Sequence, residues 1–139
     1  MNLSEIKIIN LIPQREPFVM VDHLVKVDEN STQSEFEIKL GNILTVGNYF
    51  TEAGMIENIA QTAAARSGYE SIIEKKQVQL GYIGSIKNLE ISILPSVGDK
   101  IFTEVKTINQ IFNVNIIKGS VFLNDKIIAS CEMKIFINS

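Results

Sequence analysis

One long alanine-rich helical segment, set among alternating strand patterns, constrains the fold of this chain most strongly. Residues 52–73 form this segment, and Thr51 can cap its first turn. Apolar side chains recur along it at helical spacing: Ile56, Ile59, Ala60, Ala63 and Ala64. Because alanine adds little bulk, another element can approach the axis of this helix closely. The sequence therefore predicts a helix from Glu52 to Ile73 that other elements cover.

Most of the remaining chain has strand patterns. Alternating or apolar runs predict strands at 18–27, 33–40, 79–94, 101–108, 113–123 and 127–137. Residues 4–11 favour a short helix that Pro13 ends, and residues 41–50 favour an irregular loop. In the second strand, Phe36, Ile38 and Leu40 share one face, which we expect to be buried. We predict one α+β domain over residues 1–139, in which about six antiparallel strands curl around the long helix.

Composition and charge exclude several classes of function. The chain has 139 residues, with 13 basic and 16 acidic side chains, and its net charge of −3 argues against nucleic-acid binding. The single cysteine, Cys131, excludes an internal disulfide framework, and no spacing typical of a metal site or of a cofactor-binding loop occurs. We find no secretion signal and no apolar run long enough to span a membrane, so we expect a cytoplasmic protein without metal or cofactor.

Three segments carry a resemblance to a known family. The run LIPQREPFVMVD (residues 11–22) resembles the N-terminal motif of the hotdog-fold β-hydroxyacyl-acyl-carrier-protein dehydratases, with Gln14 in place of a histidine. The run GMIENIAQTAA (residues 54–64) is similar to the helix motif of that family, and residues 80–101 resemble its following strand and turn. The chain is most similar in pattern to dehydratase-like proteins of aryl-polyene and flexirubin-type pathways. The resemblance implies a hotdog fold.

The resemblance also implies site residues. In the family, the helix carboxylate, here Glu57, assists at the departing hydroxyl, and a glutamine, here Gln61, shapes the site by hydrogen bonding. Backbone N–H groups at the helix start, here those of Ala53 and Gly54, face the thioester carbonyl, where the helix dipole stabilises negative charge. Among apolar neighbours, burial would raise the pKa of Glu57 and make it a proton donor. From residues alone, a solvent-facing glutamate or one that caps the helix N-terminus explains Glu57 better than a site residue does, and a solvated helix side chain explains Gln61 equally well.

The main departure from the family is a missing base. The dehydratases carry a histidine in the loop before the helix, fourteen residues before the glutamate, where this chain has Ile43, and the loop 44–54 contains no histidine. Asn48 and Tyr49 occupy that loop and are candidates for substrate binding, although packing within the loop explains them better. Neither is a competent base near neutral pH. His23 lies in another motif, where a structural role is the expectation.

Three functions remain open. The chain is a 3-hydroxyacyl-acyl-carrier-protein dehydratase that is weak alone, an acyl thioesterase that uses a helix carboxylate, or a non-catalytic subunit of a hotdog heterodimer. The expected partners are an acyl-carrier protein or acyl-CoA thioester and a second hotdog chain, identical or related. Because carrier proteins are acidic, we expect positive charge at the mouth of the site, and the candidates are Arg15, Arg66, Lys75, Lys76 and Lys87.

Overall fold

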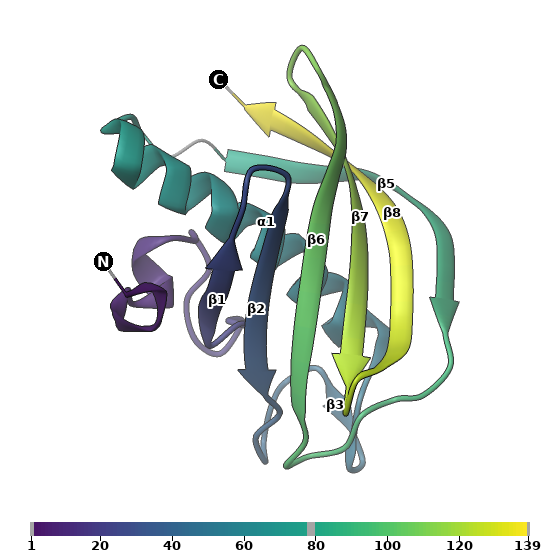
Figure 1. Ribbon diagram of the computed structural model, residues 1–139. Coiled ribbons are helices and arrows are strands. Elements are labelled where there is room, and N and C mark those ends of the chain that lie inside the picture. The colour runs from purple at the N-terminus through teal and green to yellow at the C-terminus, as the bar shows by residue number, and fades with distance from the viewer. Residues whose placement is uncertain (1, 78–79, 139) are drawn as a thin grey trace.

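The protein consists of an antiparallel sheet curved around one long helix (Figure 1). The computed structural model describes residues 2–77 and 80–138. Its main helix is α1 (Glu52–Glu74), and its long strands are β1 (His23–Val27), β2 (Ser31–Glu37), β5 (Leu80–Ile91), β6 (Lys100–Ile111), β7 (Val114–Leu123) and β8 (Lys126–Asn138). All neighbours in the order β1-β2-β6-β7-β8-β5 pair antiparallel. The predicted six-stranded α+β hotdog architecture is confirmed.

A side-chain cap at Thr51 and a left-handed residue at Lys75 mark the two ends of helix α1. The hydroxyl oxygen of Thr51 accepts a hydrogen bond from the Gly54 backbone N–H, as an N-cap does, and Lys75 ends the helix in the left-handed conformation. The predicted helix is therefore confirmed to within one residue at its end. Its glycines permit close packing, because a Cβ on Gly54 would overlap the Phe50 ring and one on Gly68 would overlap the Leu11 carbonyl.

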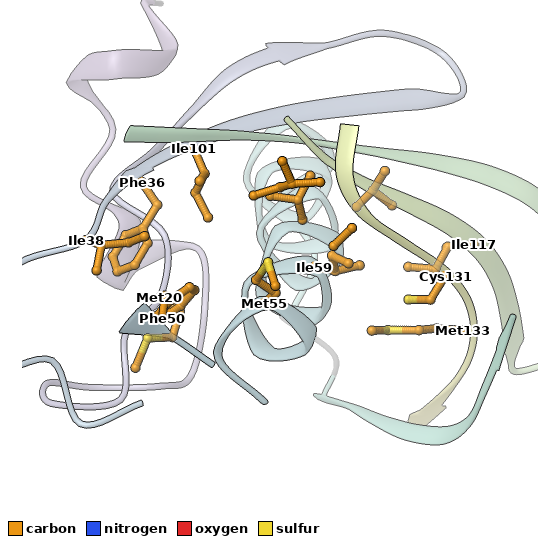
Figure 2. Close-up of a cluster of buried hydrophobic side chains, with 14 residues drawn as sticks. Met20, Phe36, Ile38, Phe50, Met55, Ile59, Ile101, Ile117, Cys131 and Met133 are labelled. Carbon is orange, nitrogen blue, oxygen red and sulfur yellow. The ribbon is translucent and has the colours of Figure 1, made fainter. Parts of the chain in front are cut away.

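The core lies between α1 and the concave face of the sheet. Met55 and Ile59 point from the helix into this layer, with Phe36, Ile38 and Phe50 toward one end and Ile117, Cys131 and Met133 toward the other (Figure 2). A smaller cluster joins the N-terminal segment to β1 and α1 through Ile6, Leu11, Ile12, Val19, Leu24 and Ala65. Burying this apolar surface stabilises the wrapped arrangement.

The predicted N-terminal helix is wrong. Residues 4–11 instead contain parts of two separate 3₁₀ turns, η1 (Leu3–Glu5) and η2 (Ile8–Asn10), with extended backbone at Ile6 between them. Ile6 is buried in the cluster that includes Leu24 on β1, and η1 packs against β1. A continuous helix would direct this side chain differently, so tertiary packing overrides the local helical pattern here.

The first predicted strand is too long, and the second is shifted. Residues 18–22 precede β1 because side chains of α1 bind the backbone of Phe18 and Met20. Strand β2 begins at Ser31 and ends at Glu37, and Ile38 then bonds to Asp99 and Gly98 at the next turn. Leu40 is 88% exposed, so only Phe36 and Ile38 of the expected face are buried.

The loop before α1 is more regular than predicted. It contains two short paired strands, β3 (Thr45–Val46) and β4 (Tyr49–Phe50), joined by Gly47 in the left-handed conformation. The later strands occur where the sequence predicts them, although β6 extends to Ile111 and β5 ends at Ile91. The predicted start of the fifth strand at Gln79 lies outside the described residues.

Candidate functional site

Glu57 lies on the second turn of α1 and is held by Gln61, one turn later. The Gln61 side-chain amide donates to Glu57 Oε2 over 2.8 Å and to the Phe18 carbonyl over 2.9 Å. Its carbonyl oxygen accepts from the Met20 N–H over 2.7 Å. Gln61 is only 1% exposed, so these bonds lie in a region from which water is largely excluded. The geometry fixes the orientation of the Glu57 carboxylate relative to the N-terminal segment.

Asn58 anchors the same turn of α1 on its buried side. Its amide donates to the Met20 carbonyl over 2.8 Å, and its oxygen accepts from the Thr103 hydroxyl on β6. Our sequence analysis did not identify Asn58. A polar side chain among Met55, Ile59 and other apolar core positions is the signal that indicates such a buried anchor.

A cavity of about 400 Å³ opens along the face of α1 that carries Glu57 and the small side chains. This volume is near the lower end of the range for small-molecule sites. Its walls come from α1, from the N-terminal segment and from strands β5 to β8, and the residues nearest the middle of the helix are Ala60, Ala63, Ala64 and Ser67. Ile83, Val105, Ile117, Ile135 and Ile137 form the facing apolar wall. An apolar ligand chain fits this lining.

Two buried side-chain oxygens lack a hydrogen-bond partner within residues 2–77 and 80–138, and both line this cavity. They are Gln14 Oε1, in the N-terminal segment, and Asn115 Oδ1, on β7. Unpaired buried acceptors are costly, so a ligand or water in the cavity would supply their donors. From the sequence, Gln14 was noted only as the residue that replaces the histidine of the N-terminal motif. No sequence pattern indicated that Asn115 would line a cavity.

Of the predicted site residues, Glu57 lines this cavity, whereas Gln61, Asn48, Tyr49, Ala53 and Gly54 do not. Asn48 is exposed and its carbonyl accepts from the Val97 N–H, while the side chain of Tyr49 is 53% exposed on β4. Ala53 is exposed in the first turn of α1, and Gly54 is buried against Phe50. The chain thus brings Glu57 and Gln61 together but leaves the β3–β4 loop and the helix start directed elsewhere. Their role in substrate binding remains a prediction.

No histidine or thiol joins Glu57 among the residues that line this cavity. His23 lies on β1, where its Nε2 is 3.1 Å from the Glu35 carboxylate, which also pairs with Lys100. Burial, and secondarily the charge of Glu132, raises the pKa of the Cys131 thiol to about 11, so it is a poor nucleophile. Within the described part of the chain, no group of three or more His, Cys, Asp or Glu side chains could hold a metal ion.

Arg66 has a structural role that the sequence did not indicate. Its guanidinium donates to the carbonyls of Glu29 and Ser31 and to the Thr32 hydroxyl, and it pairs with Glu70 over 3.3 Å. It is therefore engaged and is not a free cation at the mouth of the site. Arg15, Lys75, Lys76 and Lys87 are exposed.

The chain resembles known proteins in both sequence and structure. It is 31% identical over 117 residues to a 3-hydroxyacyl-[acyl-carrier-protein] dehydratase FabZ from Rhizobium etli. This alignment covers 78% of the present chain and 72% of the Rhizobium protein. Its fold matches the dehydratase heterocomplex ApeI:P from Xenorhabdus doucetiae with a TM-score of 0.84 and 13% identity, covering 96% and 92% of the two chains. A hypothetical thioesterase with coenzyme A from Streptococcus pneumoniae matches with a TM-score of 0.66 and 7% identity, over 94% and 91%.

The two structural matches show a shared fold, whereas the assignment of the chain to a family rests on the comparisons of sequence. Within residues 2–77 and 80–138, no helix has the length and apolar character needed to cross a membrane. A family model described as ApeP dehydratase matches residues 6–139, nearly the whole chain. With the identity to the FabZ protein, this match shows that the chain belongs to the ApeP-like family of hotdog-fold dehydratases.

Proposed function

We propose that this chain is the carboxylate-bearing subunit of a 3-hydroxyacyl-acyl-carrier-protein dehydratase, and that a second hotdog chain supplies the base. The observation that carries the proposal is the oriented Glu57, held by Gln61 at a cavity that has one apolar wall and no histidine in its lining. The FabZ relative acts on acyl-carrier-protein thioesters, and the ApeI:P match is a dehydratase heterocomplex. These comparisons support the substrate class and the paired state.

The proposed reaction needs a base at C2 of the substrate and an acid at its C3 hydroxyl. A base from the second chain removes a proton from C2, and the released electron pair forms the C2–C3 double bond. The C3–O bond breaks as Glu57 gives its proton to the departing hydroxyl, which leaves as water. The product is the α,β-unsaturated thioester, and Glu57 regains the proton that the base has taken up. The backbone N–H of Ala53 at the start of α1 is the proposed donor to the thioester carbonyl, because the N–H of Gly54 is already bonded to the Thr51 hydroxyl.

The free edge of the sheet supports the pairing. Among the residues that the structure describes, strand β5 pairs with β8 alone, and apolar side chains along it remain exposed, including Ile83 at 40%, Ile86 at 37% and Leu89 at 42%. An edge with unpaired backbone groups and apolar side chains favours association with another strand. We propose that β5 joins the sheet of the second hotdog chain, and we place the protein in the cytoplasm, where its single reduced thiol is stable.

The test is a comparison of the chain alone with the chain in complex. We would co-purify it with a histidine-bearing hotdog protein and follow conversion of a 3-hydroxyacyl carrier-protein thioester by mass spectrometry. The complex should dehydrate the substrate, and Glu57→Gln should lower its rate by about 10²–10⁴-fold, because the amide keeps the shape but cannot donate the proton. Brisk dehydration by the purified chain alone that survives Glu57→Gln would contradict the proposal.

A thioesterase is the second candidate, because Glu57 lies at this cavity away from Glu29 and Glu70 at its Arg66 end, and one carboxylate can direct water at an acyl carbonyl. The same assay separates the two functions. A thioesterase releases free acid and free thiol, whereas a dehydratase keeps the thioester and loses one water. Release of thiol that depends on Glu57 and needs no second chain would favour the thioesterase.

A further inference from the structure

The cavity has a chemically distinct far end, about two and a half to three and a half helical turns beyond Glu57. Its middle is lined by Ala60 and Ala64, which are one turn apart on α1. Its far end contains Arg66 and Glu70 together with Glu29 and Asn30, which belong to the β1–β2 turn. The lining therefore changes along the helix from small apolar side chains to charged and polar groups.

The far end is held together by several bonds. Arg66 binds the Glu29 carbonyl over 2.5 Å and the Ser31 carbonyl over 2.9 Å, which fastens the β1–β2 turn to α1. The Asn30 carbonyl accepts from the Thr107 N–H over 2.9 Å, which fastens the same turn to β6. The Arg66 side chain is only 14% exposed. A hydrocarbon chain that passed this point would have to break these bonds and bury charged groups against methylenes, which is costly.

We propose that the alanine-lined groove is a ruler for the acyl chain, in which the tail runs from Glu57 toward the C-terminal half of α1 and stops at the Arg66 wall. This inference rests on the proposed function for the position of the reacting carbon. From Glu57 to Arg66 the helix rises about 14 Å, which spans about eleven bonds of an extended chain. If C3 of the acyl chain lies beside Glu57, the longest acyl chain that fits has about fourteen carbons, counted from the thioester carbonyl.

The ruler makes a quantitative prediction for two matched substitutions. A phenylalanine at Ala60 or Ala64 would fill the groove at two depths, about 6 Å apart along the helix, or about five bonds of an extended chain. Ala60→Phe should therefore end the accepted chain about five carbons earlier than Ala64→Phe. Ile73→Phe is the control, because it adds the same ring at a position on α1 that is 58% exposed and outside the cavity lining.

The experiment measures binding, which does not require turnover. Saturated acyl-CoA thioesters of increasing length would be titrated into the chain, and into its complex with a histidine-bearing hotdog protein, by calorimetry. In the unsubstituted protein and in Ile73→Phe, affinity should rise about fourfold per added methylene up to the limit and then stop rising. Arg66→Ala should move the limit to longer chains, with circular dichroism checking that the variant is folded.

Each outcome decides between the ideas. The longest acyl chain that still gains affinity should be shorter in Ala60→Phe than in Ala64→Phe. If the two limits are equal, or if the limit is shorter in Ala64→Phe, the proposed direction of the tail is wrong. This comparison does not depend on whether Arg66→Ala folds. Length-dependent binding with the predicted order, but no dehydration in any complex, would retain the ruler and reject the proposed reaction. If the complex dehydrates substrates of every length equally well with and without Ala60→Phe or Ala64→Phe, the proposed reaction stands and the ruler is wrong.

Discussion

Gln61→Met tests whether the buried amide holds Glu57 and the N-terminal segment together. Methionine is similar in volume to glutamine, so the change removes hydrogen bonds with little change in packing. Three bonds are lost: those from Gln61 to the Phe18 carbonyl and to Glu57, and that from the Met20 N–H to Gln61. The Met20 N–H would be left buried without a partner, which costs about 1–3 kcal/mol, and the Phe18 carbonyl would lose about 1 kcal/mol more.

We therefore expect Gln61→Met to lower the free energy of unfolding by about 2–4 kcal/mol. Urea titration followed by circular dichroism would show a lower midpoint with an unchanged slope, because the surface exposed on unfolding stays the same. Gln33→Met is the matched control. Gln33 makes one 3.3 Å bond to Glu104 at a partly buried position on β2, so we expect a change of about 0.5 kcal/mol or less.

The reasoning would be refuted if Gln61→Met unfolded within about 0.5 kcal/mol of the unsubstituted protein. Such a result would mean that water or a rearranged segment replaces the amide, and that Gln61 does not fix Glu57. The reasoning would also be contradicted if Gln33→Met lowered the free energy of unfolding as much as Gln61→Met does, because the effect would then not depend on burial.

Three further predictions concern packing, pH and assembly. Gly68→Ala should destabilise the chain by about 1–3 kcal/mol in thermal melts, because its Cβ would overlap the Leu11 carbonyl; an unchanged melting temperature would show that the segment can move away. The raised pKa of Cys131 means that the unfolded thiol ionises first, so stability should fall between pH 9.0 and about 11, and Cys131→Ala should show a smaller fall in urea titrations across that range. Equal falls would exclude this thiol as a cause. Leu89→Lys on the free edge should shift the protein toward monomer in light scattering, alone or with its partner, whereas Ile108→Lys on the interior strand β6 should not. A monomeric unsubstituted protein under both conditions would reject the edge pairing.

The sequence alone determined the central architecture of this protein. The alanine-rich segment with its Thr51 cap predicted α1, and the alternating pattern of residues 101–108 predicted the strand β6, because these patterns depend on local geometry. The motif around Glu57 likewise predicted the family, which the sequence comparisons confirm. These features depend on residues close together in the chain, so their spacing is sufficient to identify them.

Only the tertiary structure decided which polar groups meet. The start of β1 at His23 depends on hydrogen bonds that join Gln61 and Asn58 to residues about forty positions earlier in the chain. Arg66 was expected at the mouth of the site, yet it fastens the β1–β2 turn at the far end of the cavity. Such contacts join segments that are distant in sequence, and their partners are selected by packing of the whole fold. Local periodicity carries no information about them, because it describes one segment at a time.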